Sequence, residues 1–504
     1  MIFDNLAVAL PLVFNFPTLL TILVCAAFGL FVGAVPGLSA TMATAMLVPM
    51  TFFMTPVTAI ASIVTCAAMA IFASDIPAAL IRIPGTAASA AYVDEMHQYT
   101  RQGRVHRALG ISVVCSTIGG IIGTLILIFA APQLAEVSLN FTSFEYFWLA
   151  LLGLTAAVML GTGSIVKGLL SLALGLLIAC VGLDGASGYP RFTFGQENLI
   201  GGIAFVPALI GMFALPEVIR TLLGSIHVDK PQKVRGLWSL FDGLGGSLWR
   251  YRVNLVRGSL IGTIIGILPG AGSDIGSWIA YATAKMRSKT PEQFGKGHDE
   301  GLVEACSANN GALSGAYVPA LVFGIPGDSI TAIVIGVLYM KGLNPGPMIF
   351  VNNAPQVTAI FLVFILANLL IVPLGLLAIR LASTVLLVPK QILAPLILVF
   401  CIVGSYAIDA SASGIVIMLA MGVLAYAMEE NGFPVAPTIL GIVMGGLVER
   451  SLITSLIKSD GSVLAFFDRP ISGSLGVFTL LVWGMPIVLR SLRKSQARIA
   501  TSRS

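Results

Sequence analysis

The scarcity of charged residues constrains this chain more than any other feature of its sequence. Of 504 residues, 28 are Lys or Arg and 23 are Asp or Glu, so only 10% carry charge, whereas 57% are hydrophobic. A soluble domain has about 25% charged residues, and so few charges cannot cover a water-exposed surface of this size. The composition excludes a cytosolic enzyme, a nucleic-acid-binding protein and a disordered chain. It predicts an all-α polytopic membrane protein.

Three other residue types refine this prediction. The 54 Gly and 26 Pro residues favour a transporter with discontinuous helices over a simple anchor, because membrane helices tolerate both types where helices pack closely or break. The six Cys residues stand singly in apolar stretches without Cys-x-x-Cys spacing. We therefore expect neither disulfides, nor a metal site, nor a cofactor.

Most basic residues gather in four segments, at 101–107, 220–257, 285–296 and 490–503. The positive-inside rule places these segments in the cytoplasm, with the N-terminus in the periplasm and the C-terminus in the cytoplasm. Several apolar runs between them are too short for a bilayer core of about 30 Å, so we expect half-helices or re-entrant hairpins. The predicted helices lie near 17–35, 39–54, 57–74, 108–131, 144–160, 165–182, 198–219, 258–268, 273–284, 301–322, 329–340, 356–379, 391–407, 410–427, 435–449 and 472–489.

Two motifs recur along the chain. The string at 29–37 recurs at 262–270, an offset of 233, and the string at 77–85 recurs at 319–327, an offset of 242. Repetition at fixed offsets indicates two related halves. The predicted parts are a first repeat at 17–220, a cytoplasmic basic linker at 221–254, a second repeat at 255–450, and an extra C-terminal transmembrane helix with a basic cytoplasmic tail at 471–504.

The loop charges predict that the two repeats have inverted topology. The turn at 54–56 has no basic residue, whereas its counterpart at 285–296 has four. Conversely, the segment at 101–107 has three Arg residues, whereas its counterpart at 341–355 has only Lys341. Parallel halves would require matching charges. Inverted repeats are typical of secondary transporters, which bind substrate at broken helices near the middle of the membrane.

Four Pro-Gly pairs occupy corresponding positions in the two halves. Proline interrupts a helix, glycine lets the backbone turn, and a Ser or Thr can then cap the next helix, whose N-terminus suits a carboxylate. A single Pro-Gly pair is more often a structural kink, but four in symmetric positions favour a binding site. The candidate substrate-binding residues are Pro36, Gly37, Ser39, Thr41, Pro84, Gly85, Thr86, Pro269, Gly270, Ser273, Pro326, Gly327 and Ser329.

Polar residues near the breaks are candidates for ion coupling. The stretch at 304–311 is too polar for a lipid-facing helix, and its Asn309 and Asn310 amides can ligate a cation or donate to a carboxylate; the alternative is a solvated turn. Charges within a membrane are costly and usually face a cavity. The candidate ion-coupling residues are Asp75, Asp274, Asn309, Asn310 and Asp328.

Two of these candidate assignments have structural alternatives. Arg82 either binds a substrate carboxylate or forms a structural ion pair with Asp75. Asp274 and Asp328 either ligate Na⁺ or carry H⁺, or they cap helices at an interface.

Enzyme motifs give weak matches. The string at 185–188 has the Gly-x-Ser-Gly form of intramembrane serine proteases, but that chemistry needs a His near Ser187, and the four His residues lie in loops predicted on the opposite side. The string at 270–274 is one residue longer than the Gly-x-Gly-Asp of intramembrane aspartyl proteases, and no Walker A sequence occurs. The chain is not predicted to be an enzyme.

An ordered set of short motifs resembles the large membrane subunit of tripartite tricarboxylate transporters, the TctA family. The resemblance covers nearly the whole chain, although the chain departs from the usual pattern at Ser74-Asp75 and at Val303-Glu304-Ala305, beside the candidate site. The matching motifs lie at 33–41, 83–86, 182–184, 191–195, 268–272, 294–297, 309–310, 324–327 and 342–347.

The resemblance implies a permease of the bacterial inner membrane. Its implied partners are a small membrane subunit of the TctB type, a periplasmic solute-binding protein of the TctC type, the lipid bilayer and an organic carboxylate, with no nucleic acid. The main hypothesis is import of a di- or tricarboxylate by alternating access, coupled to a Na⁺ or H⁺ gradient. The alternatives are a uniporter or channel, a membrane scaffold, and an intramembrane serine protease.

Overall fold

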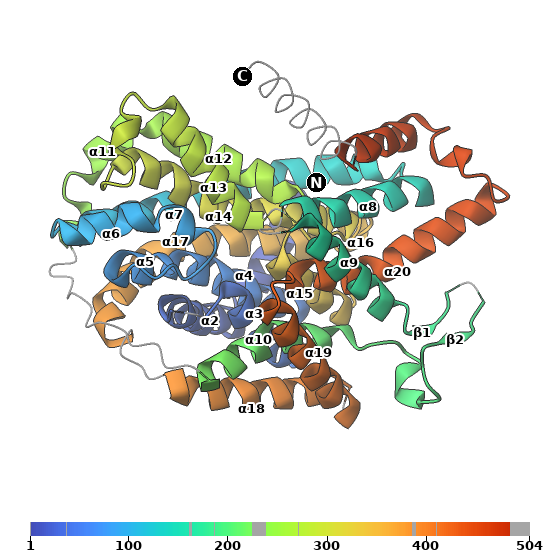
Figure 1. Cartoon of the computed structure of the whole chain (residues 1–504). Helices are drawn as coiled ribbons and strands as arrows, with labels where there is room; N and C mark the ends of the chain where they lie inside the picture. Colours follow the sequence, from blue (N-terminus) through green and yellow to red (C-terminus); the bar gives the residue numbers. More distant parts are fainter. Residues whose placement is uncertain are drawn as a thin grey trace, which may run out of the picture.

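The computed structural model describes residues 2–36, 38–160, 164–185, 187–223, 238–270, 272–385, 390–409 and 411–483. Helices build this part of the chain, as the sequence predicts (Figure 1). The exception among the described residues is a short antiparallel hairpin, in which β1 (Gly182–Leu183) pairs with β2 (Pro190–Arg191).

The first half of the chain, up to residue 223, contains the first two Pro-Gly pairs between its helices. They are α1 (Ile2–Val13), α2 (Phe16–Ala34), α3 (Ala40–Thr51), α4 (Pro56–Ala73), α5 (Asp75–Ile81), η1 (Ser89–Ala91), α6 (Val93–Arg101), α7 (Val105–Ser138), α8 (Ser143–Leu160), α9 (Ile165–Ala179), η2 (Glu197–Leu199) and α10 (Phe205–Leu223).

The part of the chain from residue 238 onward contains the other two Pro-Gly pairs between its helices. They are η3 (Trp238–Phe241), α11 (Leu244–Arg250), α12 (Arg252–Ile267), α13 (Gly272–Arg287), η4 (Pro291–Gln293), α14 (Asp299–Phe323), α15 (Ser329–Met340), α16 (Ile349–Asn352), α17 (Ala354–Val385), α18 (Lys390–Asp409), α19 (Ala412–Glu430), α20 (Val435–Lys458), η5 (Leu464–Phe466) and an apolar helix over Pro470–Trp483.

Helix length divides these elements into two groups. Six of the described helices are long and apolar enough to cross a membrane, the longest being Val105–Ser138. In contrast, α3 and α15 have 12 residues each and are about 18 Å long, which is less than the bilayer core of about 30 Å. Short helices therefore follow the breaks at Pro36 and Pro326, as the sequence predicts.

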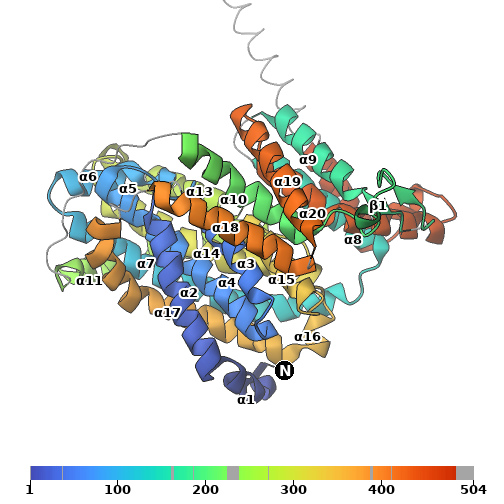
Figure 2. The same ribbon diagram turned by 90° about the horizontal axis from the view of Figure 1, so that it is seen from below.

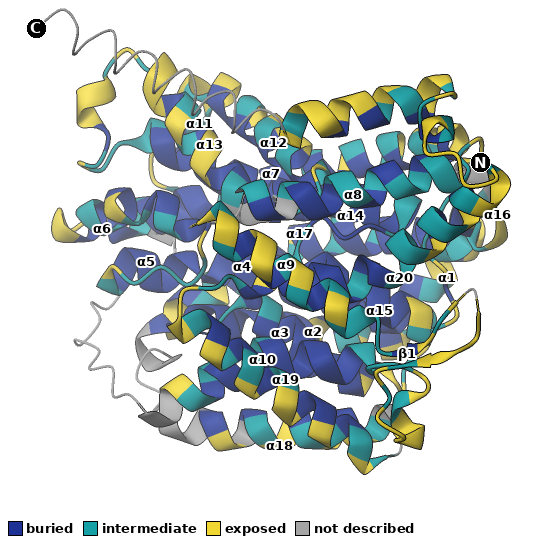
Figure 3. Ribbon diagram, turned by 45° about the vertical axis from the view of Figure 1, so that its right-hand side comes forward, coloured by how far each residue is buried: buried dark blue, intermediate teal, exposed yellow. Residues whose placement is uncertain are grey.

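The centre of the molecule is formed by α4 and α14. α14 packs against α7, α12 and α13, and every residue over 301–322 is buried. α4 and α5 are buried in the same way. Figure 3 shows both helices enclosed by others whose outer faces are exposed. The polar residues of α14 therefore lie inside the protein and not against lipid.

Glycines of α2 let this helix touch the backbone of α4. A Cβ atom added at Gly29 would lie 2.4 Å from the carbonyl oxygen of Cys66, and one at Gly33 would lie 2.3 Å from that of Ala70. Such close approach of backbones is typical of membrane helices that pack through small residues.

The same arrangement occurs between α12 and α14. A Cβ atom at Gly262 would lie 2.1 Å from the carbonyl oxygen of Ala308, and one at Gly266 would lie 2.3 Å from that of Ala312. These four residues stand at offsets of 233 (glycines) and 242 (partners) from those of the α2–α4 contact, the same offsets at which the two motifs recur.

Most predicted helix positions agree with the structure to within a few residues, whereas the short helices α1, α5, α6, α11 and α16 have no predicted counterpart. α1 packs against α17 at one end of the molecule (Figure 2). α10 begins at Phe205 and not near 198, because η2 and a turn occupy 197–202.

Parts of the predicted linker and tail lie outside the described residues. Of the linker at 221–254, residues 224–237 are not described, α10 runs to Leu223, and α12 already begins at Arg252. The tail beyond Trp483 is likewise not described.

Candidate functional site

The first break separates α2 from α3. Pro36 follows α2, and Ser39 is the N-cap of α3, whose Oγ accepts a hydrogen bond from the backbone N–H of Met42 at 3.1 Å. This is the interrupted and recapped helix predicted from the motif. Ser39 and Thr41 are half-buried, and Gly37 lies outside the described residues.

The second break differs from the prediction. After Pro84 and Gly85, the backbone N–H of Thr86 donates to Oγ of Ser89 at 3.1 Å, and that of Ser89 donates to Oγ1 of Thr86 at 3.2 Å. These bonds close a turn that leads into η1. The helical element that follows is only the short η1, whose N-cap is Ala88 without a side-chain bond, so Thr86 does not cap a regular helix as predicted.

The third break separates α12 from α13. The backbone leaves α12 after Ile267, passes Pro269-Gly270, and begins α13 at Gly272. Ser273 and Asp274 lie in the first turn of α13, but their side chains are outside the described part of the structure. Their predicted roles stay predictions.

The fourth break, at Pro326-Gly327, is capped by Asp328. The backbone N–H of Thr331 donates to Oδ1 of Asp328 at 2.8 Å, and that of Asp328 donates to Oγ1 of Thr331 at 2.8 Å. In this capping box Asp328 is the N-cap of α15, and Ser329 is the first helical residue and not the cap. Ser329 is half-buried.

The breaks meet in pairs within each half. The backbone N–H of Gly270 donates to the carbonyl of Gly327 at 2.8 Å. A Cβ atom at Gly327 would lie 2.9 Å from the carbonyl oxygen of Gly266, and one at Gly85 would lie 3.2 Å from that of Gly33. Among the described residues, no hydrogen bond joins the break residues of one half to those of the other.

Asn309 and Asn310 lie in the middle of α14, each 1% exposed, so the solvated-turn alternative is wrong. Nδ2 of Asn309 donates to the hydroxyl of Tyr92 at 3.0 Å, and Nδ2 of Asn310 donates to the carbonyl of Ala68 at 3.3 Å. Both Oδ1 atoms are buried without a hydrogen-bond partner in the described structure. Because buried polar atoms are nearly always paired, these two oxygens are candidate contacts for a cation or a ligand donor.

Asp75 and Arg82 do not form the ion pair considered from the sequence. Asp75 is 1% exposed and accepts hydrogen bonds from the hydroxyls of Tyr92 at 2.7 Å and Ser112 at 2.6 Å. Arg82 ends α5 with a left-handed φ of 57° and pairs with Asp94 at 2.7 Å, where both side chains are more than half exposed. The pairing prediction fails because α5 ends at Arg82 and the backbone turns away.

Another buried carboxylate, Glu95, joins the two halves, and no sequence pattern points to it. Its side chain is fully buried. It accepts hydrogen bonds from the backbone N–H groups of Gly295 (2.5 Å), Gly297 (2.7 Å) and His298 (2.9 Å), and from the hydroxyl of Tyr281 (3.0 Å). Four donors aimed at one carboxylate fix α6 to the loop before α14.

A second carboxylate, that of Asp299, contacts residues from two other segments that contain basic residues. Asp299 accepts hydrogen bonds from Nη2 of Arg107 and Oγ of Ser247, both at 2.5 Å, and also from Tyr99. The segments at 94–107, 238–257 and 285–300 thus meet at one end of the molecule, which we name the basic end. The described basic residues within these three segments therefore lie at the same end of the molecule.

Replacing Glu95 by Gln is expected to loosen this contact. The Gln amide places N–H groups against N–H donors and leaves buried donors unpaired, at a cost of about 1–3 kcal/mol. We expect amide hydrogen exchange at 295–298 to speed up by about tenfold, measured by mass spectrometry. Asp94→Asn, at the neighbouring exposed position, is the matched control; unchanged exchange in Glu95→Gln contradicts the prediction.

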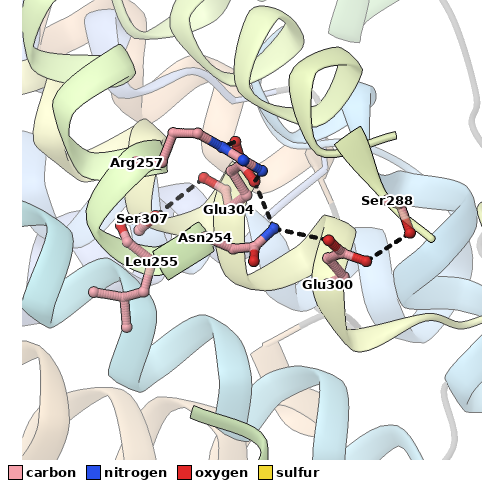
Figure 4. A network of polar contacts seen from close by, with 7 residues as sticks. All are labelled: Asn254, Leu255, Arg257, Ser288, Glu300, Glu304 and Ser307. Carbon is pink, nitrogen blue, oxygen red and sulfur yellow. Dashed lines mark hydrogen bonds and ion pairs between the residues drawn. The ribbon is translucent and has the colours of Figure 1, made fainter. Parts of the chain in front are cut away.

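A third buried carboxylate, Glu304, lies on α14 opposite α12 (Figure 4). Arg257 donates to both of its oxygens, with Nε at 2.6 Å from Oε1. Asn254 donates to Glu304 at 2.8 Å and to Glu300 at 3.0 Å, and Ser288 donates to Glu300 at 2.7 Å. This network holds α12, α13 and α14 together beside the basic end.

Ser187 has none of the surroundings that a protease nucleophile needs. It lies in the exposed loop between β1 and β2, and its hydroxyl donates to the carboxylate of Asp184. No His contacts it in the described structure. Ser187 and Gly188 instead hydrogen-bond to Asp184.

Comparison with known proteins gives a consistent result. Residues 19–440 match the family described as "Tripartite tricarboxylate transporter TctA family". The chain is 35% identical over 448 residues to "Uncharacterized 52.8 kDa protein in TAR-I ttuC' 3'region" of Agrobacterium vitis, which covers 89% of this chain and 88% of that protein. It is 34% identical over 214 residues to "Uncharacterized protein in TAR-II ttuC' 3'region" of the same organism, covering 42% of this chain and 88% of that protein. No solved structure matches the chain.

The family match agrees with the membrane-spanning helices and with the polar residues buried among them. Such a family implies partner subunits, and it is a family of transporters and not of enzymes. The chain therefore belongs to the tripartite tricarboxylate transporter TctA family, as its multi-pass membrane component.

Proposed function

We propose that this protein is a secondary active transporter that imports an organic di- or tricarboxylate by alternating access, coupled to a Na⁺ or H⁺ gradient. A periplasmic solute-binding protein of the TctC type delivers the substrate, and a small membrane subunit of the TctB type completes the complex in the bacterial inner membrane. The observation that carries the proposal is the pair of half-length helices, α3 and α15, that follow Pro-Gly breaks in the two halves.

Inverted topology of the repeats 17–220 and 255–450 is supported by the directions of α4 and α14. These helices hold equivalent positions at the offset of 242. α14 begins at the basic end, where Asp299 binds Arg107. α4 begins at the other end, where the Nζ of Lys341 donates to the carbonyl of Phe52 at 2.7 Å, and its continuation α5 ends beside Thr100, which donates to Ala79.

The contact between α4 and α14 also supports a pseudo-two-fold axis. Ala68 and Asn310 are equivalent at the offset of 242, and they are hydrogen-bonded to each other. A residue can touch its own equivalent only near the axis that relates the two halves. Substrate and ion sites of inverted-repeat transporters lie at this kind of repeat interface.

The proposed substrate site consists of the break residues with hydroxyl and backbone N–H groups, including Ser39, Thr41, Thr86, Ser273 and Ser329. The N-termini of α3 and α15 offer N–H groups and positive dipole ends to carboxylate oxygens. Asp75, Asp274, Asn309, Asn310 and Asp328 are the proposed ion-coupling residues. The basic end is proposed to face the cytoplasm, with the N-terminus in the periplasm.

Uptake by the complete complex tests this proposal. We expect proteoliposomes that contain the chain and its two partner subunits to accumulate radiolabelled citrate or succinate when a Na⁺ or H⁺ gradient is imposed. Uptake that survives collapse of both gradients contradicts coupling and favours a uniporter, and currents far above carrier turnover favour a channel.

Combining Ser39→Ala with Asn309→Ala tests the site. Each variant removes a polar group whose hydrogen bond to a charged ligand is worth about 1.5–3 kcal/mol, so we expect at least a tenfold loss of uptake. Ser187→Ala, on the exposed hairpin, is the matched serine control and should transport normally. Full uptake by the double variant favours a purely structural membrane scaffold.

A further inference from the structure

The carboxyl group of Asp75 is enclosed by donors from three separate parts of the chain. Tyr92, which precedes α6, donates its hydroxyl to Oδ1 at 2.7 Å, and Ser112 of α7 donates to Oδ2 at 2.6 Å. The thiol of Cys306 in α14 lies 3.8 Å from Oδ2. All three partners are buried, so they hold the carboxyl group away from the surface.

No cationic side chain offsets the charge of Asp75 in the described part of the chain. The titratable groups that face it are the phenol of Tyr92 and the thiol of Cys306, which itself faces the thiol of Cys115. α2 and α4, which also pack against α5, contain no Asp, Glu, Lys, Arg or His.

Several charged and titratable groups of the other neighbouring helices have partners other than Asp75. On α6, Asp94 binds Arg82, Glu95 binds the backbone at 295–298, and His97 contacts the carbonyl of Ala79; Arg107 on α7 binds Asp299, and Glu304 on α14 binds Arg257.

These surroundings act on Asp75 in opposite directions. An ionised carboxylate buried without a cation costs free energy, and such groups bind a proton instead. Hydrogen bonds donated to the carboxylate stabilise the ionised form. Because the two influences oppose each other, a movement that removes a donor favours the proton-bound form, and one that adds a donor favours the ionised form.

An unpaired acceptor stands beside this group. Nδ2 of Asn309 donates to the Tyr92 hydroxyl, whereas its Oδ1 has no partner and the side chain is 1% exposed. If the amide turns, Oδ1 can accept the hydroxyl hydrogen that Tyr92 now donates to Asp75. Tyr92 thus has two alternative acceptors, one on α5 of the first half and one on α14 of the second.

We propose that Asp75 binds and releases the proton that is transported with the substrate, and that Tyr92 switches its hydrogen bond from Asp75 to Asn309 when the proton binds. The proton comes from water, joins one carboxylate oxygen, and later returns to water from the same oxygen, so no other reactant is needed. Release of Tyr92 frees the segment 84–92, which carries the second break, to move against α14. This inference rests on the proposed function and names its coupling ion.

Infrared spectroscopy of the purified chain in lipid vesicles tests proton binding without any substrate. We expect a carbonyl stretching band of a protonated carboxyl group that appears as the pH falls and is missing in Asp75→Asn. Asp94→Asn, an exposed aspartate nearby, should keep the band. Tyr92→Phe removes a donor to the carboxylate and should move the titration midpoint of the band to higher pH. A spectrum of Asp75→Asn that equals that of the unmodified protein at every pH overturns the proposal.

Transport by the complete complex supplies the second readout. With citrate or succinate as the probe, Asp75→Asn should lose at least tenfold of the uptake driven by a pH gradient but retain exchange of labelled for unlabelled substrate, which needs no net proton movement. Uptake that remains driven by the pH gradient in Asp75→Asn, or that depends on Na⁺ alone in the unmodified protein, overturns the proposal. Absence of any transport by the unmodified complex contradicts the proposed function instead, and the infrared result stands independently of it.

Discussion

Valine in place of Gly33 or Gly266 is expected to prevent the protein from folding into its compact state. A Cβ atom at either position would lie 2.3 Å from a backbone carbonyl oxygen, that of Ala70 or Ala312. Backbone cannot move aside as the end of a flexible side chain can, so helix α2 must separate from α4, or α12 from α14. We expect a loss of about 3 kcal/mol or more, seen as loss of the monodisperse peak in size-exclusion chromatography of the detergent-solubilised protein.

The control for this prediction is Gly245→Val. A Cβ atom at Gly245 in α11 has no neighbour within 4 Å, and valine is no worse a helix former than glycine, so this substitution should leave stability nearly unchanged. If the Gly33→Val and Gly266→Val proteins have the same elution profile and melting temperature as the Gly245→Val protein, the close contacts of α2 with α4 and of α12 with α14 do not determine stability.

Truncating Arg257 to Ala should be nearly as damaging. Glu304 is fully buried and Arg257 donates to both of its oxygens, so the truncation leaves a buried carboxylate without its cation. Breaking a buried ion pair from one side costs about 3–5 kcal/mol. We expect a clear fall in the apparent melting temperature and weaker protection of the α12 amides in hydrogen exchange.

The double variant Arg257→Met with Glu304→Met separates the ion pair from the rest of the network. Replacing both partners by apolar groups of similar size is often neutral or stabilising, so the double variant should regain most of the lost stability. A double variant as unstable as Arg257→Ala contradicts an uncompensated charge as the cause.

The sequence predicted the helix breaks because proline and glycine act locally. Proline lacks a backbone donor and disfavours helical backbone at the residue before it, and glycine permits the left-handed turn with φ of 68° at Gly324 that ends α14 before Pro326. Proline alone is not sufficient, because α14 continues through Pro319. The identity of the caps was less predictable. Asp328 and not Ser329 caps α15. Either side chain can cap a helix, and the residue at which helical backbone begins determines which of them does.

Residues that act across the chain were only partly predictable. Asp75 stood out as a charge within an apolar run, yet its partners Tyr92 and Ser112 carry no signal in the sequence, since a tyrosine or serine in a membrane helix is usual. Arg82 was a reasonable partner by spacing, but the left-handed turn at the end of α5 directs it to Asp94. Spacing along a helix predicts neighbours only while the helix continues.

The sequence alone determined the class of protein, the positions of most helices and their breaks, the two related motifs and the family. These depend on hydrophobicity and on local backbone chemistry, which each residue carries wherever it is placed. Only the tertiary structure decided that Asn309 and Asn310 are buried in α14, that Glu95 and Glu304 bind across helices, and that Asp75 has hydroxyl donors but no cationic partner among the residues described. Those facts depend on which helices pack together, and the packing is set by small residues such as Gly33 and Gly266 whose partners lie far away in the chain.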